Sequence, residues 1–529
     1  MKSISYFVKP TFSRTLLFLI PISLVFYPNC SGSRIERISE PPGQFTVTQS
    51  SEDFPFLKLH MKNGELYVLE KWNFITSKDS VSGSGKLLNP NREVISEDQF
   101  TVSMQQIVLA ETNQISVSAG TGALVALSVV TGIFTVVCIT NPKACFGSCP
   151  TFYAYNGEDY IVQSEGFSSS ISPALEEKDV DALYRINPSD DNFVIQLKNE
   201  AYETHVIRSA NLLAAPKPEG GRVFSTPDGE FLQAINITEA SSITAIEGDI
   251  SEKLCSFDGV ERFSEADSNN LASKEIIEFI FDKPVSDRMG IVIAARQTLL
   301  TTFLFYQSLA YMGTTAGEWL AKLERNSNQL KPLLEKPSVL GKIDVLMQNE
   351  KDEWVKVGEV GETGPIATDI KIVPLTKISS RVKDNSSINI KLRMAKGLWR
   401  IDYIALAELK DNVKPVIIPP STSSPQYSGS SNVVELLTNP DSVLVTYPGD
   451  KFLLNYKLPA DYYNYELFME SQGYYLEWMR NEWLAEENSN KVYQMLFNPQ
   501  QYYKDLAPQF KKVEAEMEET FWSSKYVYP

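Results

Sequence analysis

The sequence predicts a mainly β protein of the α+β class, with antiparallel β-sandwich or jelly-roll-like domains, a helical insert and a helical C-terminus. Short runs in which apolar and polar residues alternate occur along most of the chain, and this pattern is typical of half-buried strands. Asn-Gly, Pro-Gly and Asn-Pro pairs between the runs mark turns. The chain has 529 residues, of which 43% are apolar and 22% charged. This is the composition of a globular protein with about three or four domains.

The N-terminus predicts an export signal of the bacterial lipoprotein type over residues 1–30. A basic start precedes an uncharged apolar run over 15–27, and Cys30 follows within three residues. A run of this length is too short to span a bilayer and is right for a signal peptide. We therefore expect Cys30 to carry the lipid, palmitate or a similar acyl chain. An ordinary secretory signal or an uncleaved N-terminal anchor is the alternative.

A polar tether is expected over 31–49, followed by a small β-domain over 50–112. The segment 113–142 is then apolar, and Gly120–Thr140 is nearly free of polar groups other than hydroxyls. A helix over 120–140 would be roughly 30 Å long, about the thickness of a hydrocarbon core. Both a transmembrane helix and a Gly-rich buried helix fit this segment.

Strand patterns dominate the centre of the chain. An antiparallel β-domain is expected over 145–285, where the Asn156-Gly157 pair predicts a hairpin. Apolar residues at helical spacing predict a helical insert over 286–330. Alternation returns over 335–410 and predicts a further β-sandwich.

The C-terminal part begins with a Pro/Ser-rich linker, expected over 411–432. Residues 433–529 are expected to form strands and an aromatic-rich helical end. Tyr502–Trp522 has charged residues on one side and apolar residues on the other, which is typical of a helix packed on a core.

The cysteines fit an exported protein. In an oxidising compartment we expect a disulfide among Cys145, Cys149 and Cys255, with free buried thiols as the alternative. The Cys-x-x-x-Cys spacing is not that of redox or zinc motifs. The sequence thus predicts no metal site and no cofactor.

No catalytic residue can be assigned from the sequence. The chain has two histidines, His60 and His205, and neither lies in a nucleophile-like context. Phosphate-binding, dinucleotide-binding and metalloprotease motifs are missing from the sequence. Acidic pairs such as Glu176-Glu177 are present, and a glycosidase needs two carboxylates in one cleft. Whether the protein is an enzyme therefore stays open, with the weight against it.

Aromatic residues are the candidates for a ligand platform. Sugars and peptides stack on exposed aromatic rings, whereas the same spacing also fits a helix face packed on a sheet. The candidate platform residues are Trp354, Trp399, Tyr474, Tyr475 and Trp478.

Two short motifs carry a resemblance. The chain contains Phe146-Gly147-Ser148-Cys149-Pro150-Thr151-Phe152-Tyr153 with Glu165-Gly166-Phe167 behind it, and Trp399-Arg400-Ile401-Asp402 downstream. In these motifs it resembles a loosely defined group of uncharacterised exported bacterial proteins, in which a Gly-rich apolar segment precedes a Ser-Cys-Pro-aromatic-Tyr hairpin. Residues 338–409 are also similar in outline to galactose-binding-like jelly rolls. The first resemblance implies architecture only, whereas jelly rolls of the second kind often bind glycans.

The sequence therefore predicts a non-catalytic lipoprotein of the bacterial cell envelope that binds a partner or glycan or scaffolds an assembly. A carbohydrate-active hydrolase and a membrane-embedded assembly factor are the alternatives. The expected partners are the lipid bilayer, through Cys30 and 120–140, and an envelope protein or glycan. The net charge of −17 argues against nucleic acid. We expect a membrane-anchored protein at the outer membrane or cell surface rather than the inner membrane.

Overall fold

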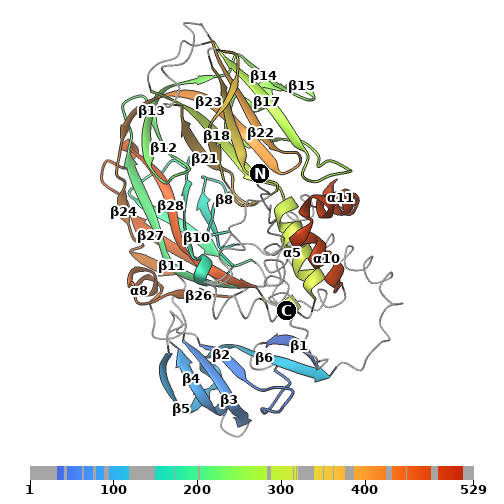
Figure 1. The fold of residues 1–529 in the computed structure, drawn as a ribbon. Helices are drawn as coiled ribbons and strands as arrows, with labels where there is room; N and C mark the ends of the chain where they lie inside the picture. Colours follow the sequence, from blue (N-terminus) through green and yellow to red (C-terminus); the bar gives the residue numbers. More distant parts are fainter. Residues whose placement is uncertain are drawn as a thin grey trace, which may run out of the picture.

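The computed structural model describes most of the chain between residues 33 and 517. Its sheets are antiparallel at nearly every pairing and its helices are few, so the predicted mainly β fold is confirmed. In Figure 1, a separate blue sheet lies at one end of a larger β-rich body, and helices α5, α10 and α11 lie beside that body. The described stretches are 33–40, 45–61, 65–75, 79–88, 94–117, 149–168, 170–171, 173–200, 203–282, 288–313, 315–316, 319, 339–349, 351–361, 363–375, 387–424, 432–447, 449–477, 486–515 and 517.

The N-terminal sheet has six antiparallel strands in the order β1-β6-β2-β3-β4-β5. Alternate residues such as Leu59 and Trp72 point into its core, as the two-residue period of a strand requires. The strands expected over 50–112 are therefore present. The expected tether over 31–49, however, contains β1, whose charged residues suit an edge strand. The strands are β1 (Ser33–Glu40), β2 (Leu57–Met61), β3 (Leu66–Ile75), β4 (Ser80–Leu88), β5 (Val94–Ser103) and β6 (Ile107–Val117).

Two sheets form what we call the first sandwich. One sheet has the order β25-β27-β10-β7-β8, and the other has the order β24-β11-β28-β9 with β26 also paired to β11. Side chains of both sheets, such as Leu197 and Met469, belong to one core. The strands are β7 (Thr151–Tyr155), β8 (Tyr160–Glu165), β9 (Glu177–Ala182), β10 (Asn192–Lys198), β11 (Glu203–Pro216), β24 (Val416–Ile418), β25 (Thr422–Ser424), β26 (Leu444–Thr446), β27 (Lys451–Lys457) and β28 (Tyr465–Glu477).

Two further sheets form the second sandwich. One has the order β13-β12-β21-β18-β23-β16, in which β13 also pairs with β23 and closes a ring of strands. The other has the order β15-β14-β17-β22-β19-β20. The strands are β12 (Arg222–Ser225), β13 (Phe231–Glu239), β14 (Ser242–Ala245), β15 (Gly248–Asp249), β16 (Arg262–Phe263), β17 (Lys274–Phe281), β18 (Met289–Gln297), β19 (Ile343–Gln348), β20 (Trp354–Val360), β21 (Asp369–Pro374), β22 (Ile388–Ala395) and β23 (Trp399–Asn412).

The strand pairings cross the domain boundaries expected from the sequence. β28, from the expected unit 433–529, pairs with β11 of the expected domain 145–285. β24 and β25 lie inside the expected linker 411–432. The expected β-sandwich over 335–410 supplies only part of the second sandwich, because β17 and β18 pair with β22 and β23. Long-range pairing of this kind leaves no trace in local composition.

The expected helical insert over 286–330 begins with a strand instead. Every residue of β18 is buried, because one face packs in the core shared with the second sheet and the other in a core reached by β9, β11 and β28. A strand buried on both faces is a continuous apolar run, and periodicity cannot distinguish such a run from a buried helix. Among the described residues of this insert, the helix proper is α5 (Leu300–Met312).

Helices α5, α10 (Ser489–Phe497) and α11 (Pro499–Phe510) lie together at one side of the body, whereas α8 (Val433–Thr438) lies at the opposite side (Figure 1). The Phe303 and Phe510 rings are 5.1 Å apart between centroids, which joins α5 to α11. Helical structure near the C-terminus is therefore confirmed, although α11 ends at Phe510. The remaining helices of the described stretches are α4 (Ser251–Leu254), α8 (Val433–Thr438), α10 (Ser489–Phe497) and α11 (Pro499–Phe510), with 3-10 turns η2 (Met104–Gln106), η3 (Pro173–Leu175) and η5 (Tyr462–Asn464).

The membrane predictions fall mostly outside the described residues. The signal over 1–30, the lipid site Cys30 and the apolar segment 120–140 all lie there. Of the helices in the described stretches, none combines the length and the apolar character needed to cross a bilayer.

Candidate ligand-binding pocket

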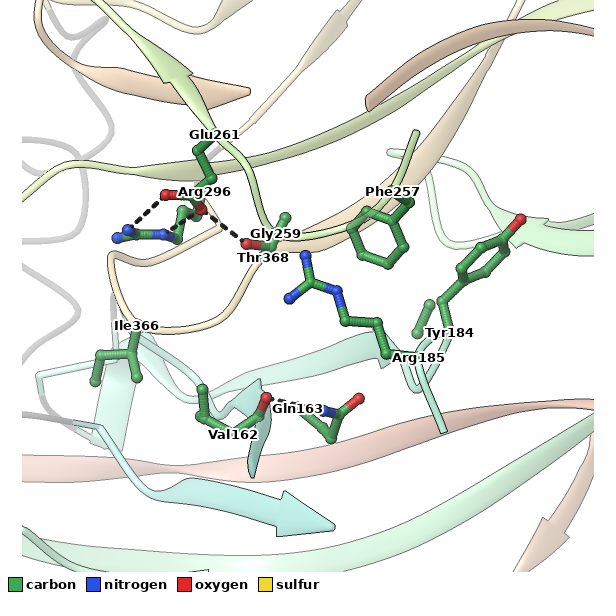
Figure 2. A pocket seen from close by; sticks show the side chains of 11 residues that line it. Val162, Gln163, Tyr184, Arg185, Phe257, Gly259, Glu261, Arg296, Ile366 and Thr368 are labelled. Atoms are coloured by element: carbon green, nitrogen blue, oxygen red, sulfur yellow. Dashed lines mark hydrogen bonds and ion pairs between the residues drawn. The ribbon is translucent and has the colours of Figure 1, made fainter. Parts of the chain in front are cut away.

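A cavity of ≈ 230 Å³ lies between the two sandwiches. The first sandwich contributes β8 and the turn after β9, and the second contributes the loop around 257–261, the end of β18 and the loop 363–368 (Figure 2). Both polar and apolar side chains line it. The lining residues are Val162, Gln163, Ala182, Tyr184, Arg185, Phe257, Gly259, Glu261, Arg296, Ile366 and Thr368.

Arg296 and Glu261 form a closed ion pair at one wall. Arg296 donates from Nε to Glu261 Oε1 at 2.6 Å and from Nη2 to Oε2 at 2.7 Å. Its Nη1 donates to the Pro365 carbonyl at 2.6 Å, and Thr368 Oγ1 donates to Glu261 at 3.1 Å. Both contacts fix the loop 363–368 against β18. These hydrogen bonds engage each guanidinium nitrogen of Arg296 with protein, so this pair shapes the pocket.

Arg185 is held differently. Its Nη2 contacts Asp402 of β23, and its guanidinium carbon lies 4.2 Å from the centroid of the Phe257 ring. Asp402 is fully buried and also accepts from the Gly259 N–H at 3.1 Å. Burial raises the pKa of the Asp402 carboxyl, and the charge of Arg185 opposes that shift. The guanidinium is thus oriented by one carboxylate and one ring, with 33% of the side chain still exposed.

Figure 2 shows the Arg185 guanidinium pointing into the space between Phe257 and Thr368, with Gln163 on the opposite side. Among the described residues, Arg185 Nε and Nη1 have no hydrogen-bond acceptor. Gln163 donates from Nε2 to the Val162 carbonyl at 3.0 Å, which leaves its Oε1 as an acceptor. The cavity therefore offers two unused donor nitrogens of Arg185 and one acceptor from Gln163.

The aromatic wall is a packed structure rather than an open platform. Tyr184 and Phe257 meet edge to face with centroids 5.4 Å apart. The faces of Tyr184 are occupied by Phe224, at 5.7 Å between centroids, and by the Arg222 guanidinium at 3.4 Å. Such packing holds Tyr184 rigid, and it leaves ring edges to face a ligand.

The loop 363–368 is also held from behind by Glu165, the last residue of β8. Its carboxylate accepts from the Ile366 N–H at 2.8 Å. Burial raises the pKa of Glu165 to about 8, although the backbone hydrogen bond from Ile366 opposes the shift. Gly364 has φ +76°, and a Cβ there would come within 2.4 Å of the carboxylate. The close approach and the positive φ both require glycine at this position.

Cys149 and Cys255 are free thiols in the structure, and Cys145, the third cysteine of the expected disulfide, lies outside the described residues. Cys149 is buried against Glu165. Burial, together with the nearby carboxylates Glu165 and Glu203, raises the pKa of this thiol well above its usual value. A thiol in such surroundings is a poor nucleophile, so Cys149 has a packing role.

The expected aromatic platform is not assembled. Trp399, Tyr474 and Tyr475 have exposures of 1%, 1% and 6% and belong to the core. Tyr474 and Tyr475 are buried as the alternative had it, but on strand β28 rather than on a helix face. Trp354 is half-buried, with Lys391 Nζ 4.1 Å from its ring centroid. Trp478 lies outside the described residues. None of these four described residues lines the pocket.

The pocket residues Arg185, Glu261 and Arg296 were not predicted. Arg296 carried a signal, since a charged residue inside a long apolar run needs a buried partner. The two quoted motifs also reach the pocket. Glu165 holds its loop, and Asp402 holds Arg185. Arg185 itself follows a strand in an ordinary turn and carries no signal.

Within the described stretches, no group of three or more His, Cys, Asp or Glu side chains is placed to hold a metal ion. Chemically, the pocket can orient a small molecule by hydrogen bonds and apolar contact. No protein-family model matches the chain, and a search of curated proteins finds no similar sequence.

Proposed function

We propose that this protein is a non-catalytic lipoprotein of the bacterial cell envelope that binds a sugar-sized ligand, such as a glycan unit, between its two sandwiches. The observation that carries the proposal is the ≈ 230 Å³ cavity with a guanidinium that is oriented by protein but not saturated by it. Ligand sites are concave, mostly preformed, and supplied with a few convergent polar groups. The volume suits a ligand smaller than a typical drug.

The chemistry of the lining favours binding over hydrolysis. An acid-pair glycosidase needs two carboxylates across the bond that it cleaves. Glu261 is the only carboxylate among the described lining residues, and Arg296 and Thr368 occupy both of its oxygens. Asp402 lies behind Arg185 with a fully buried side chain.

The test fills the cavity. We expect sugars or small organic acids that raise the melting temperature of the full chain to lose this effect in Val162→Phe, because Val162 lines the cavity from β8. Val355→Phe is the matched control, since Val355 is a partly buried strand residue outside the cavity. Unchanged stabilisation of Val162→Phe by the same ligands would place binding elsewhere and end the proposal.

The envelope location has its own test. Cys30→Ser should move the protein from the membrane fraction to the soluble fraction if the acyl chain is its anchor. Digestion of a tag after Pro529 by proteinase K in intact cells, with a periplasmic control protected, would place the β-rich body on the cell surface. Survival of the tag would place it behind the outer membrane and favour a scaffold.

A further inference from the structure

We infer that the ligand of this pocket carries a carboxylate, which Arg185 binds, and that its class is the acidic monosaccharides; this inference rests on the proposed function. The starting observation is a contrast among the arginines in ion pairs. Arg208, Arg222 and Arg296 each present Nε to a glutamate, at 2.6 Å in all three cases. Arg185 has no such acceptor for Nε among the described residues.

Arg185 is prepared for such a partner in advance. The contact with Asp402 and the stacking on Phe257 fix the plane of its guanidinium. Asp402 is fixed in turn by the Gly259 N–H. Ordering a free arginine side chain costs conformational entropy, so a guanidinium that is already ordered binds an anion with a smaller penalty.

The geometry selects a planar anion. Nη2 of Arg185 has two N–H groups and makes one contact, to Asp402, so its second N–H lies beside an N–H of Nε or Nη1. Such a neighbouring pair of N–H groups matches the two oxygens of a carboxylate. The described side chains that line the cavity carry two positive charges, on Arg185 and Arg296, and one negative charge, on Glu261, and the Asp402 carboxylate lies behind Arg185 outside the lining. Because Glu261 is paired with Arg296 through two hydrogen bonds, the donors left for a ligand are those of Arg185.

The rest of the lining selects a sugar-like body. Gln163 Oε1 can accept from a hydroxyl group, and Val162 and Ile366 provide an apolar surface for a C–H face (Figure 2). A simple fatty acid would leave Gln163 Oε1 without a partner, and a neutral sugar would give the unused N–H groups of Arg185 no charged acceptor. An acidic monosaccharide satisfies both groups, and buried polar groups must be satisfied for tight binding.

The experiment compares D-glucuronate with D-glucose and with acetate by isothermal titration of the full chain. We expect D-glucuronate to bind most tightly, and Arg185→Gln to weaken it by about tenfold to a hundredfold. Arg185→Lys keeps the charge without the fork and should lose part of the affinity. Arg208→Gln is the matched control, because Arg208 has a similar exposure, 26% against 33%, and lies outside the cavity.

Each outcome separates the inference from the proposed function. Equal affinity for D-glucose and D-glucuronate, or unchanged D-glucuronate affinity in both Arg185 variants, would overturn the carboxylate and leave a sugar-binding pocket. Acetate binding as tightly as D-glucuronate would overturn the sugar. If none of the three binds, the inference fails, while the cavity-filling variant still decides the proposed function with other ligands.

Discussion

Two polar clusters join the two sandwiches, and they differ in how many donors they leave unused. In the first, which we call the buried ionic contact, Lys371 of β21 lies 2.7 Å from Asp369 and also donates to the Val180 carbonyl at 2.7 Å and to Ser225 Oγ at 3.1 Å. The ammonium group has three donors, and all three are engaged. In the second, the pocket, Arg185 uses one nitrogen.

Each cluster pairs a basic side chain with carboxylates, so charge alone does not distinguish a cluster with a structural role from one that binds a ligand. Burial would lower the pKa of Lys371, but the carboxylates Asp369 and Asp181 raise it above its usual value. Asp181 accepts from Ser164 Oγ at 2.6 Å and from the Glu165 N–H at 3.0 Å. An enclosed cluster whose hydrogen-bond donors are all engaged holds two elements together. A group that faces a cavity with unused donors can bind a ligand.

The largest effect should come from breaking the buried ionic contact. Lys371→Met removes the cation and leaves the carboxylates of Asp369 and Asp181, which are 4% and 8% exposed. We expect a loss of about 3–5 kcal/mol in the free energy of unfolding, because a buried charge loses its partner. Urea denaturation measures it. Lys457→Met, whose lysine is 65% exposed in its pair with Asp191, should cost less than about 1 kcal/mol. Equal losses would refute the comparison.

The second prediction concerns Glu165, which touches both clusters. Its pKa is raised to about 8 in the folded protein from a usual value of 4.5. The stability that it contributes is fully present below pH 4.5 and is lost as the pH rises to about 8. The slope from this group should reach about 1.4 kcal/mol per pH unit. Glu165→Gln should remove that slope from the stability–pH profile.

The measurement is urea denaturation of wild type and Glu165→Gln at several pH values between 4.5 and 8. Burial also raises the pKa values of Asp181 and Asp402, and these groups give a slope of the same sign in both proteins. The difference between the two profiles therefore belongs to Glu165. Glu158→Gln, at an exposed residue of the same hairpin, should leave the profile unchanged. Parallel profiles of wild type and Glu165→Gln would contradict the burial of an unpaired carboxyl behind the pocket loop.

The two clusters also show what sequence could predict. The alternating runs around Leu59 or Leu197 predicted strands correctly, because each buries one face and its pattern is local. The apolar run over β18 did not predict a strand, because burial on both faces removes the alternation of apolar and polar residues. Trp399 was ambiguous for a related reason, since an aromatic ring on a strand has the same sequence pattern in a core as at a surface.

The pocket itself depends on strands far apart in the chain. Arg185 meets Asp402, more than two hundred residues later, only because the second sandwich packs on the first. Glu261 and Arg296 both belong to the second sandwich, where the loop before β16 meets the end of β18. Arg296 within an apolar run and Asp402 within its short motif were visible as unusual residues, but their partners were not, because partner choice is set by tertiary contacts that a single sequence does not display.

The third prediction concerns the loss in stability when the pocket loses the Arg185 guanidinium. Arg185→Gln should cost about 1–2 kcal/mol, less than Lys371→Met, because removal of the guanidinium should open a path for water from the cavity to Asp402, and the Gly259 N–H remains bound to it. The double variant Arg185→Gln/Asp402→Asn should recover part of the loss, since no buried charge then lacks a partner. A cost above that of Lys371→Met in the same urea series would mean that Arg185 is a structural group.

The smallest effects come from one hydroxyl in each cluster. Ser225 Oγ accepts from Lys371 within the buried ionic contact, and Thr368 Oγ1 donates to Glu261 beside the cavity. Ser225→Ala should cost about 1–2 kcal/mol, since Ser225 is 1% exposed and water cannot replace it at the ammonium group. Thr368→Val keeps the side-chain shape and should cost about 0.5–1 kcal/mol, because Glu261 retains both bonds from Arg296 and lines a cavity large enough to admit water. Parallel urea titrations measure the loss in the free energy of unfolding for both variants. A larger loss for Thr368→Val would mean that the pocket is as closed to water as the buried ionic contact. The unused donors of Arg185 would then result from packing and would not mark a binding group.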